Sequence, residues 1–128
     1  MDTNKLSILI RKPIDEVFSF SLESDNVPKW IKSIRIEIPS ERPVRLGTKL
    51  RNIGIDKKSA WDEYEIIEFD PPKSFTLKLL NGDYFVKYTF SETPSGTEFE
   101  YLEWSESGLN NRFEMEALEK LKELLESR

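Results

Sequence analysis

The order of hydrophobic patterns is the feature that most restricts what this chain can fold into. An alternating strand pattern over residues 5–11 leads into two short helical patterns, six further strand patterns and one amphipathic helical pattern over residues 109–126. One helix cannot cover a flat sheet of seven strands, so its apolar side is buried only if the sheet curls around it. We therefore predict an α+β fold in which a curved seven-stranded antiparallel sheet wraps the C-terminal helix. Two short helices follow the first strand, and a cavity lies between sheet and helix.

Alternation and turn residues define the strands. Leucine and isoleucine alternate with polar residues in the first strand, which is typical of a half-buried strand. Two prolines interrupt the chain within residues 70–73, Asn81-Gly82 favours a two-residue hairpin with positive φ, and Ser95-Gly96 marks a further turn. The remaining strands are predicted over residues 34–38, 49–55, 61–69, 74–80, 84–90 and 97–105.

The helices carry their own signals. Pro13 has the fixed φ and missing N–H that suit a first helical turn, and Ser24 or Asp25 is the predicted cap of the second helix. Trp30, on the apolar side of that second helix, is predicted to anchor the core. The connection before the last helix is expected to comprise only residues 106–108. The apolar stripe of the last helix consists of Phe113, Ala117, Leu121, Leu124 and Leu125.

Composition excludes several classes of function. With no cysteine and no histidine, the chain lacks disulfides, imidazole bases and the usual zinc ligands, so no cofactor or metal is expected. A net charge of −5, with Lys and Arg scattered among acids, argues against nucleic-acid binding. No stretch approaches the roughly 20 apolar residues that span a bilayer, and no signal-peptide pattern is present. We expect a cytoplasmic protein without stable membrane insertion, and a single domain over residues 1–128.

Strand alternation also predicts which side chains face the cavity, because every second residue points to the same side. In the 61–69 strand we expect Asp62, Tyr64 and Ile66 to face the cavity. If the other side of this strand faced inward, two glutamates would be buried together with Trp61, Ile67 and Phe69, unless a bulge reverses the facing midway along the strand. The loop over residues 39–47 is a candidate entrance. The predicted ligand-binding residues are Leu50, Asn52, Asp62, Tyr64, Ile66, Leu77, Tyr88, Tyr101, Glu103, Phe113 and Leu121.

Glu103 is the best candidate for a catalytic residue. It shares one side of its strand with Phe99 and Tyr101, so it is a carboxyl on an otherwise apolar stripe. Burial disfavours the charged form of a carboxyl, which would make Glu103 a candidate acid, base or hydrogen-bond donor. The alternative is that it lies in water at the frayed end of the sheet.

Short segments in a characteristic order resemble a known family. They are PIDEVF at residues 13–18, DNVPKW at 25–30, GT at 47–48, EFDPPK at 68–73 and SGTE at 95–98. Nearly the whole chain is similar to the START/birch-pollen-allergen superfamily, also called SRPBCC, and most similar to its polyketide cyclase/dehydratase-like branch. This resemblance implies a helix-grip fold with a hydrophobic cavity, and activities that range from lipid, hormone and polyketide binding to cyclisation, dehydration and protein interaction.

Binding or transport of a small hydrophobic ligand (lipid, aromatic or polyketide-like) is the leading functional prediction. The first alternative is a cyclase or dehydratase in which Glu103 or Asp62 moves a proton and a tyrosine hydroxyl stabilises an enolate oxygen. The second alternative is a module that binds a protein partner. Replacing Glu103 by Gln is expected to spare the binding of a carrier and to abolish the turnover of an enzyme.

Overall fold

The computed structural model describes residues 1–55 and 61–128. Its elements are β1 (Asp2–Ile10), α1 (Ile14–Leu22), the 3₁₀ turn η1 (Ser24–Asn26), α2 (Val27–Trp30), β2 (Ile34–Pro39), β3 (Lys49–Gly54), β4 (Asp62–Asp70), β5 (Ser74–Leu79), β6 (Phe85–Thr93), β7 (Gly96–Ser105) and α3 (Met115–Glu126). The strands form one antiparallel sheet in the order β1-β7-β6-β5-β4-β3-β2. The predicted seven-stranded antiparallel sheet is confirmed, with β1 paired to β7.

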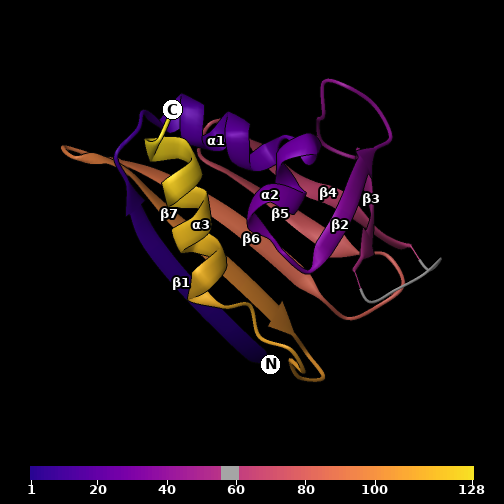
Figure 1. The fold of residues 1–128 in the computed structure, drawn as a ribbon. Coiled ribbons are helices and arrows are strands. Elements are labelled where there is room, and N and C mark those ends of the chain that lie inside the picture. Colours follow the sequence, from indigo (N-terminus) through magenta and orange to yellow (C-terminus); the bar gives the residue numbers. More distant parts are fainter. Residues whose placement is uncertain (56–60) are drawn as a thin grey trace.

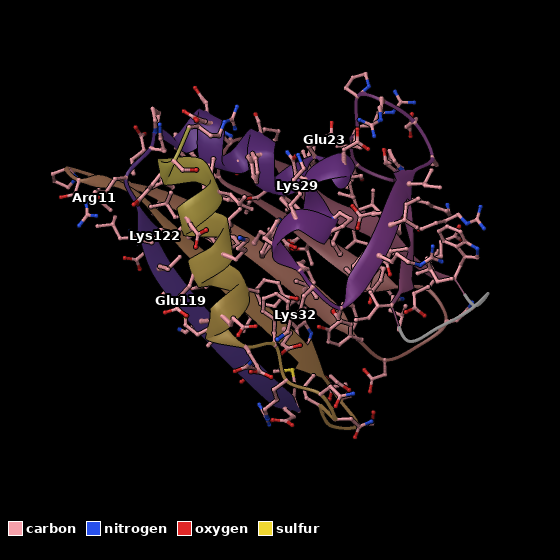
Figure 2. All side chains as sticks on the ribbon, viewed as in Figure 1. Arg11, Glu23, Lys29, Lys32, Glu119 and Lys122 are labelled. Atoms are coloured by element: carbon pink, nitrogen blue, oxygen red, sulfur yellow. The ribbon has the colours of Figure 1, made fainter. Side chains whose placement is uncertain are left out.

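The sheet curls around α3, which confirms the predicted helix-grip fold. Figure 1 shows α3 lying across the concave face against β1 and in front of β7, with α1 and α2 beside it and β2 and β3 at the far end. Leu118, Leu121 and Leu125 of α3 are fully buried. Charged side chains such as Glu119 lie on the outer side of the helix (Figure 2). Among the described residues, no helix combines the length and apolar character needed to cross a membrane.

One half of the concave face is closed by tight packing. Phe18 of α1 contacts Phe75 and Phe90 edge-on, with ring centroids 5.7 and 5.2 Å apart, and Phe90 stacks on Phe99 at 5.1 Å. We call this region the packed half. Its buried members are Ile10, Val17, Phe18, Phe75, Phe90, Phe99, Leu118, Leu121 and Leu125.

The last helix begins at Met115 and not at residue 109, so the connection after β7 covers residues 106–114 and is longer than predicted. Carboxylates fix the backbone of this connection by accepting its N–H groups: Asp83 accepts those of Glu106 and Ser107, Asp2 that of Leu109, and Glu103 that of Phe113. These side-chain bonds favour an extended path over a further helical turn. Phe113 therefore precedes the helix, although its ring still packs against the core.

A bulge changes the facing of β4, as the sequence allowed. Its pairing with β5 shifts register between Ile66 and Glu68. Ile66 faces inward and is fully buried, whereas Ile67 is exposed. After the bulge Phe69 turns inward and packs against Phe18, with ring centroids 6.2 Å apart. The extra residue lets Phe69 reach the core on the same side as Ile66, while Trp61 and Ile67 stay exposed.

Two local predictions are wrong. Neither Ser24 nor Asp25 caps the second helical segment, because Glu23 accepts the Asp25 N–H at 3.0 Å and the Ser24 hydroxyl donates to Glu37. Asn81-Gly82 does not form a two-residue hairpin, because the connection covers residues 80–84 and Gly82 is not among the described glycines with positive φ. The Ser95-Gly96 turn is present; Gly96 has φ of 141°, and a Cβ there would lie 2.4 Å from a backbone oxygen of β1.

Candidate functional site

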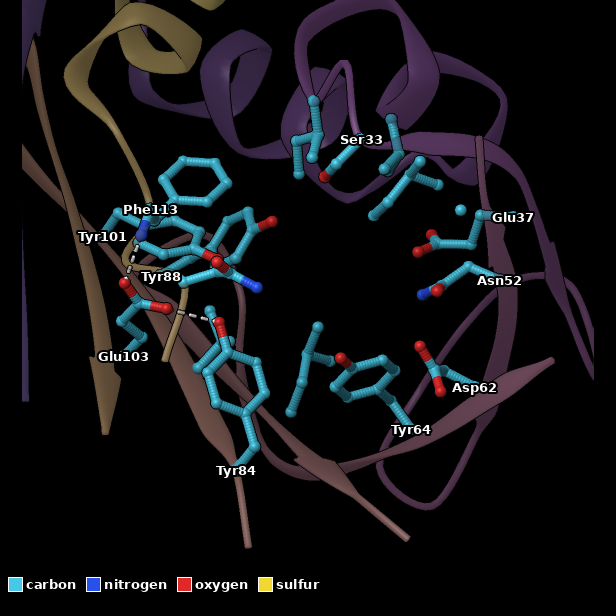
Figure 3. Close-up of a pocket in the computed structure, with 17 residues that line it drawn as sticks. Ser33, Glu37, Asn52, Asp62, Tyr64, Tyr84, Tyr88, Tyr101, Glu103 and Phe113 are labelled. Carbon is cyan, nitrogen blue, oxygen red and sulfur yellow. Dashed lines mark hydrogen bonds between the residues drawn. The ribbon is translucent and has the colours of Figure 1, made fainter. Parts of the chain in front are cut away.

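A cavity of about 330 Å³ occupies the half of the concave face that α3 leaves open. It lies between the sheet, α2 and the 106–114 connection, and Figure 3 shows its side chains arranged around the open space. The lining residues are Val27, Ile31, Ser33, Ile34, Glu37, Asn52, Gly54, Asp62, Tyr64, Leu77, Tyr84, Val86, Tyr88, Tyr101, Glu103, Asn111 and Phe113. A space of this size is at the lower end of the usual range for small-molecule pockets.

All four tyrosines of the chain line this cavity. Tyr64 lies on β4, Tyr84 immediately precedes β6, Tyr88 lies on β6 and Tyr101 on β7. Tyr88 and Tyr101 are paired across the two strands. The Tyr101 ring stacks on Phe113 with centroids 3.9 Å apart, so the connection forms part of the wall. Burial raises the pKa of each tyrosine, so the hydroxyls stay protonated as neutral hydrogen-bonding groups.

Glu103 is fully buried at one wall of the cavity. Its Oε1 accepts a hydrogen bond from the Tyr84 hydroxyl at 2.6 Å, and its Oε2 accepts from the Asn4 side-chain amide at 2.8 Å and the Phe113 N–H at 2.5 Å. The alternative that Glu103 lies in water at a frayed strand end is therefore wrong. Because protein donors occupy both oxygens, the cavity meets Glu103 through the Tyr84 hydroxyl (Figure 3).

Glu37 faces the cavity from the opposite wall, where it is 8% exposed. Its carboxyl accepts a hydrogen bond from the Ser24 hydroxyl at 2.8 Å and is also hydrogen-bonded to Asn52. Burial raises the pKa of Glu37 to about 7, which the two hydrogen bonds only partly oppose. A buried carboxyl that titrates near neutral pH is suited to exchanging a proton with a bound molecule.

A bulge in β2 explains why Glu37 escapes sequence reasoning. The pairing of β2 with β3 shifts register between Ile34 and Ile36, which reverses the facing of the residues that follow. Ile36 and Ile38 are consequently 40% and 45% exposed. In the sequence, Ile34, Ile36 and Ile38 alternate with Arg35 and Glu37, which favours isoleucines that face inward and a glutamate that faces outward. The bulge that reverses this facing leaves no signal in the residue pattern.

Asn52 and Asp62 lie opposite each other on β3 and β4, and both line the cavity beside Glu37 (Figure 3). The structure brings together most of the predicted ligand-binding residues, namely Asn52, Asp62, Tyr64, Leu77, Tyr88, Tyr101, Glu103 and Phe113. The lining residues that the prediction omitted include Glu37 and Tyr84. Tyr84 is four residues before Tyr88, so strand alternation places both side chains on the same inward side. This alternation could have identified Tyr84 as a lining residue.

Three predicted residues lie outside the cavity, because other parts of the chain cover them completely. Leu121 is buried in the packed half. Ile66 is fully buried, with its backbone hydrogen-bonded to Gly47 and Thr48, and Leu50 is 2% exposed. No residue of the loop over 39–47 lines the cavity, so this loop does not form its entrance. Arg42 of the loop is bound to Glu23 and Asp25.

A groove of about 430 Å³ between α2 and the start of α3 adjoins the cavity. The two spaces share the lining residues Ile31, Ser33, Asn111 and Phe113. Trp30 forms part of its floor but is 2% exposed, and it contacts Tyr88, Phe99 and Phe113 edge-on. Trp30 is thus a core anchor, as predicted.

Solved structures share this fold at low sequence identity. Protein NE0264 from Nitrosomonas europaea is 15% identical with a TM-score of 0.78, and the match covers 99% of this chain and 97% of that one. The structure of Ara h 8.0201 is 13% identical with a TM-score of 0.70 and 99% of both chains covered. DynU16, a putative protein in the dynemicin biosynthetic locus, is 16% identical with a TM-score of 0.74; 99% of this chain matches 48% of that one.

None of the curated proteins compared with this chain matches it. A family model described as "Polyketide cyclase / dehydrase and lipid transport" matches residues 1–126. The match covers the cavity walls as well as the packed half, and it agrees with the helix-grip architecture. The chain therefore belongs to the polyketide cyclase/dehydrase and lipid transport family.

Proposed function

We propose that this chain binds a small molecule with an apolar body and polar substituents in the cavity between the sheet, α2 and the 106–114 connection. The observation that carries the proposal is the lining: four tyrosines and several aliphatic side chains surround the space, while Glu37, Asn52 and Asp62 gather on one wall. Apolar contacts supply affinity, and the few polar groups orient the ligand. The family match and the fold likeness agree with such a role.

The test is recovery of a ligand from the purified protein. Native mass spectrometry should detect an adduct that disappears on unfolding, and extraction should then identify it. The matched control is Leu77→Trp, which places a larger side chain in the cavity wall and should prevent the adduct without preventing folding. An adduct retained by this variant would place the ligand elsewhere. The absence of an adduct, together with no thermal shift across a library of lipids and aromatic compounds, would favour a protein partner.

Acid–base catalysis of the cyclase type is a second candidate, and one observation favours it. Glu37 is a buried cavity carboxyl with a pKa of about 7, which suits a general acid or base at neutral pH. Glu37 replaces Glu103 as the residue that separates the two functions, because the oxygens of Glu103 are bound to protein donors. In an enzyme, Glu37→Gln should abolish turnover of a bound substrate. In a carrier, the wild type and Glu37→Gln should both release the bound ligand chemically unchanged.

A further inference from the structure

Two tyrosine hydroxyls link the buried Glu103 to the inside of the cavity. The Tyr84 hydroxyl donates a hydrogen bond to Oε1 of Glu103 at 2.6 Å, and the Tyr101 hydroxyl donates in turn to the Tyr84 oxygen. Glu103 and Tyr101 lie on β7, Tyr84 immediately precedes β6, and all three line the cavity (Figure 3). We call these three hydrogen-bonded side chains the tyrosine network.

Glu103 determines the direction of the hydrogen bonds in the tyrosine network. Its Oε2 accepts from the Asn4 amide and the Phe113 N–H, so both of its oxygens act as acceptors. A tyrosine hydroxyl has only one proton to donate. The proton of Tyr84 is used on Glu103, so the Tyr84 oxygen can only accept, and Tyr101 uses its own proton there. Burial raises the pKa of both tyrosines, so neither hydroxyl ionises near neutral pH.

The Tyr101 oxygen is therefore the end of the tyrosine network, and it is left as a hydrogen-bond acceptor. Tyr101 lines the cavity, and among the described residues only Tyr84 is hydrogen-bonded to its hydroxyl. Its ring is held between neighbours, with centroids 3.9 Å from Phe113 and 5.3 Å from Tyr88. Turning the Tyr101 proton toward a ligand would break its bond to Tyr84, whereas accepting a hydrogen bond from a ligand leaves the network intact. Each bond in such a series also polarises the next, which further opposes reversal.

We propose that the Tyr101 oxygen selects a ligand that carries a hydroxyl group on an apolar body, and disfavours the analogue in which a carbonyl replaces the hydroxyl. This inference rests on the proposed function, since it names the polar group that the same cavity recognises. The ligand hydroxyl donates to Tyr101, and the apolar body contacts side chains such as Leu77 and Val86. A carbonyl oxygen at this point meets a lone pair and has no proton to share with it.

Two neutral probes with the same carbon skeleton test this proposal. They are 1-phenylethanol, which donates and accepts hydrogen bonds, and acetophenone, which only accepts them. NMR-monitored titration at pH 7 measures both affinities and maps the perturbed amides, which should lie around the cavity. The measured quantity is the ratio of the alcohol affinity to the ketone affinity in each protein.

The variants change one member of the tyrosine network at a time. Tyr101→Phe removes the acceptor, and the wild-type ratio should exceed the ratio in this variant by about fivefold. Tyr84→Phe removes the acceptor of the Tyr101 proton, so Tyr101 can donate to a ligand, and the acetophenone affinity should rise several-fold above the wild-type value. The matched control is Tyr64→Phe, which removes a cavity hydroxyl outside the network and should not produce this rise. Amide spectra establish that each variant is folded.

Two results would overturn selection by Tyr101 and leave the proposed function standing, because the probes would still bind in the cavity. One is an equal ratio in the wild type and Tyr101→Phe, a comparison that stands alone if Tyr84→Phe fails to fold. The other is an acetophenone affinity that does not rise in folded Tyr84→Phe. Binding of neither probe would also overturn the selection, while an adduct lost in Leu77→Trp would still support the cavity as a binding site.

Discussion

Glu103 and Glu37 are buried carboxyls on opposite walls of one cavity, and their surroundings give them different roles. Glu103 accepts hydrogen bonds from Asn4 of β1, from Tyr84 and from the backbone of Phe113, so it joins three segments of the chain. Glu37 has the Ser24 hydroxyl and Asn52 as neutral partners, and burial dominates its protonation. We therefore infer a structural role for Glu103 and propose Glu37 as the carboxyl that meets a ligand.

Replacing Glu103 by Gln should destabilise the protein by about 1–3 kcal/mol. The side-chain amide has one acceptor oxygen in place of two, so at least one of the three buried donors loses its partner. Urea unfolding measures the change, and Glu98→Gln on the same strand is the control, expected to lie within about 0.5 kcal/mol of the wild type. Equal stability of the two variants would contradict the structural role of Glu103.

Replacing Glu37 by Gln should change how stability depends on pH. Folding raises the pKa of Glu37 from 4.5 to about 7, so the folded protein retains a proton that the unfolded chain has lost. The wild type should therefore lose stability relative to Glu37→Gln as pH rises through this window, by up to about 3 kcal/mol. Urea unfolding of both proteins at pH 5 and pH 8 checks the sign. Parallel pH profiles would show that Glu37 is not desolvated.

At the scale of elements, side-chain carboxylates determine where α3 begins. Asp83, just before β6, accepts the N–H groups of Glu106 and Ser107 at 3.0 and 2.7 Å and a hydrogen bond from the Ser105 hydroxyl. These hydrogen bonds lower the pKa of Asp83 to about 2. The connection is thereby held beside β7, and this places Phe113 against Tyr101 in the cavity wall.

Asp83→Asn should loosen this connection. The neutral amide is a weaker acceptor and offers one oxygen, so hydrogen exchange at Glu106 and Ser107 should accelerate by about tenfold. Exchange at Phe99, in the middle of β7, should not change, and this amide serves as an internal control. Equal protection in the variant and the wild type would mean that other contacts hold the connection.

These elements also show where sequence reasoning succeeds and where it fails. Alternation correctly orients Tyr88, Tyr101 and Glu103, because β6 and β7 pair in unbroken register. It misplaces Glu37 because one bulge reverses β2, and it starts the last helix too early because distant carboxylates fix the chain before Met115. Local patterns carry propensities, whereas bulges and long-range hydrogen bonds depend on tertiary partners that a pattern does not name.

For the whole molecule, the order of elements was sufficient to predict the curled sheet, because a single amphipathic helix leaves only one economical way to bury seven strands. The same order leaves the concave face unequally filled. α1 and α3 close the packed half, and the shorter α2 with the 106–114 connection covers the cavity. We therefore propose that the packed half supplies most of the stability and that the other half of the same sheet binds the ligand.

Two leucines with the same chemistry test this division. Leu118 in the packed half is fully buried, whereas Leu77 borders the cavity and is half-buried. Leu118→Ala should cost about 2–5 kcal/mol because it opens a void among close-packed side chains, and Leu77→Ala should cost less than about 2 kcal/mol because part of its surface already faces open space. Urea unfolding measures both. Equal losses would mean that the cavity half contributes as much to stability as the packed half, and substitutions there would then alter folding and binding together.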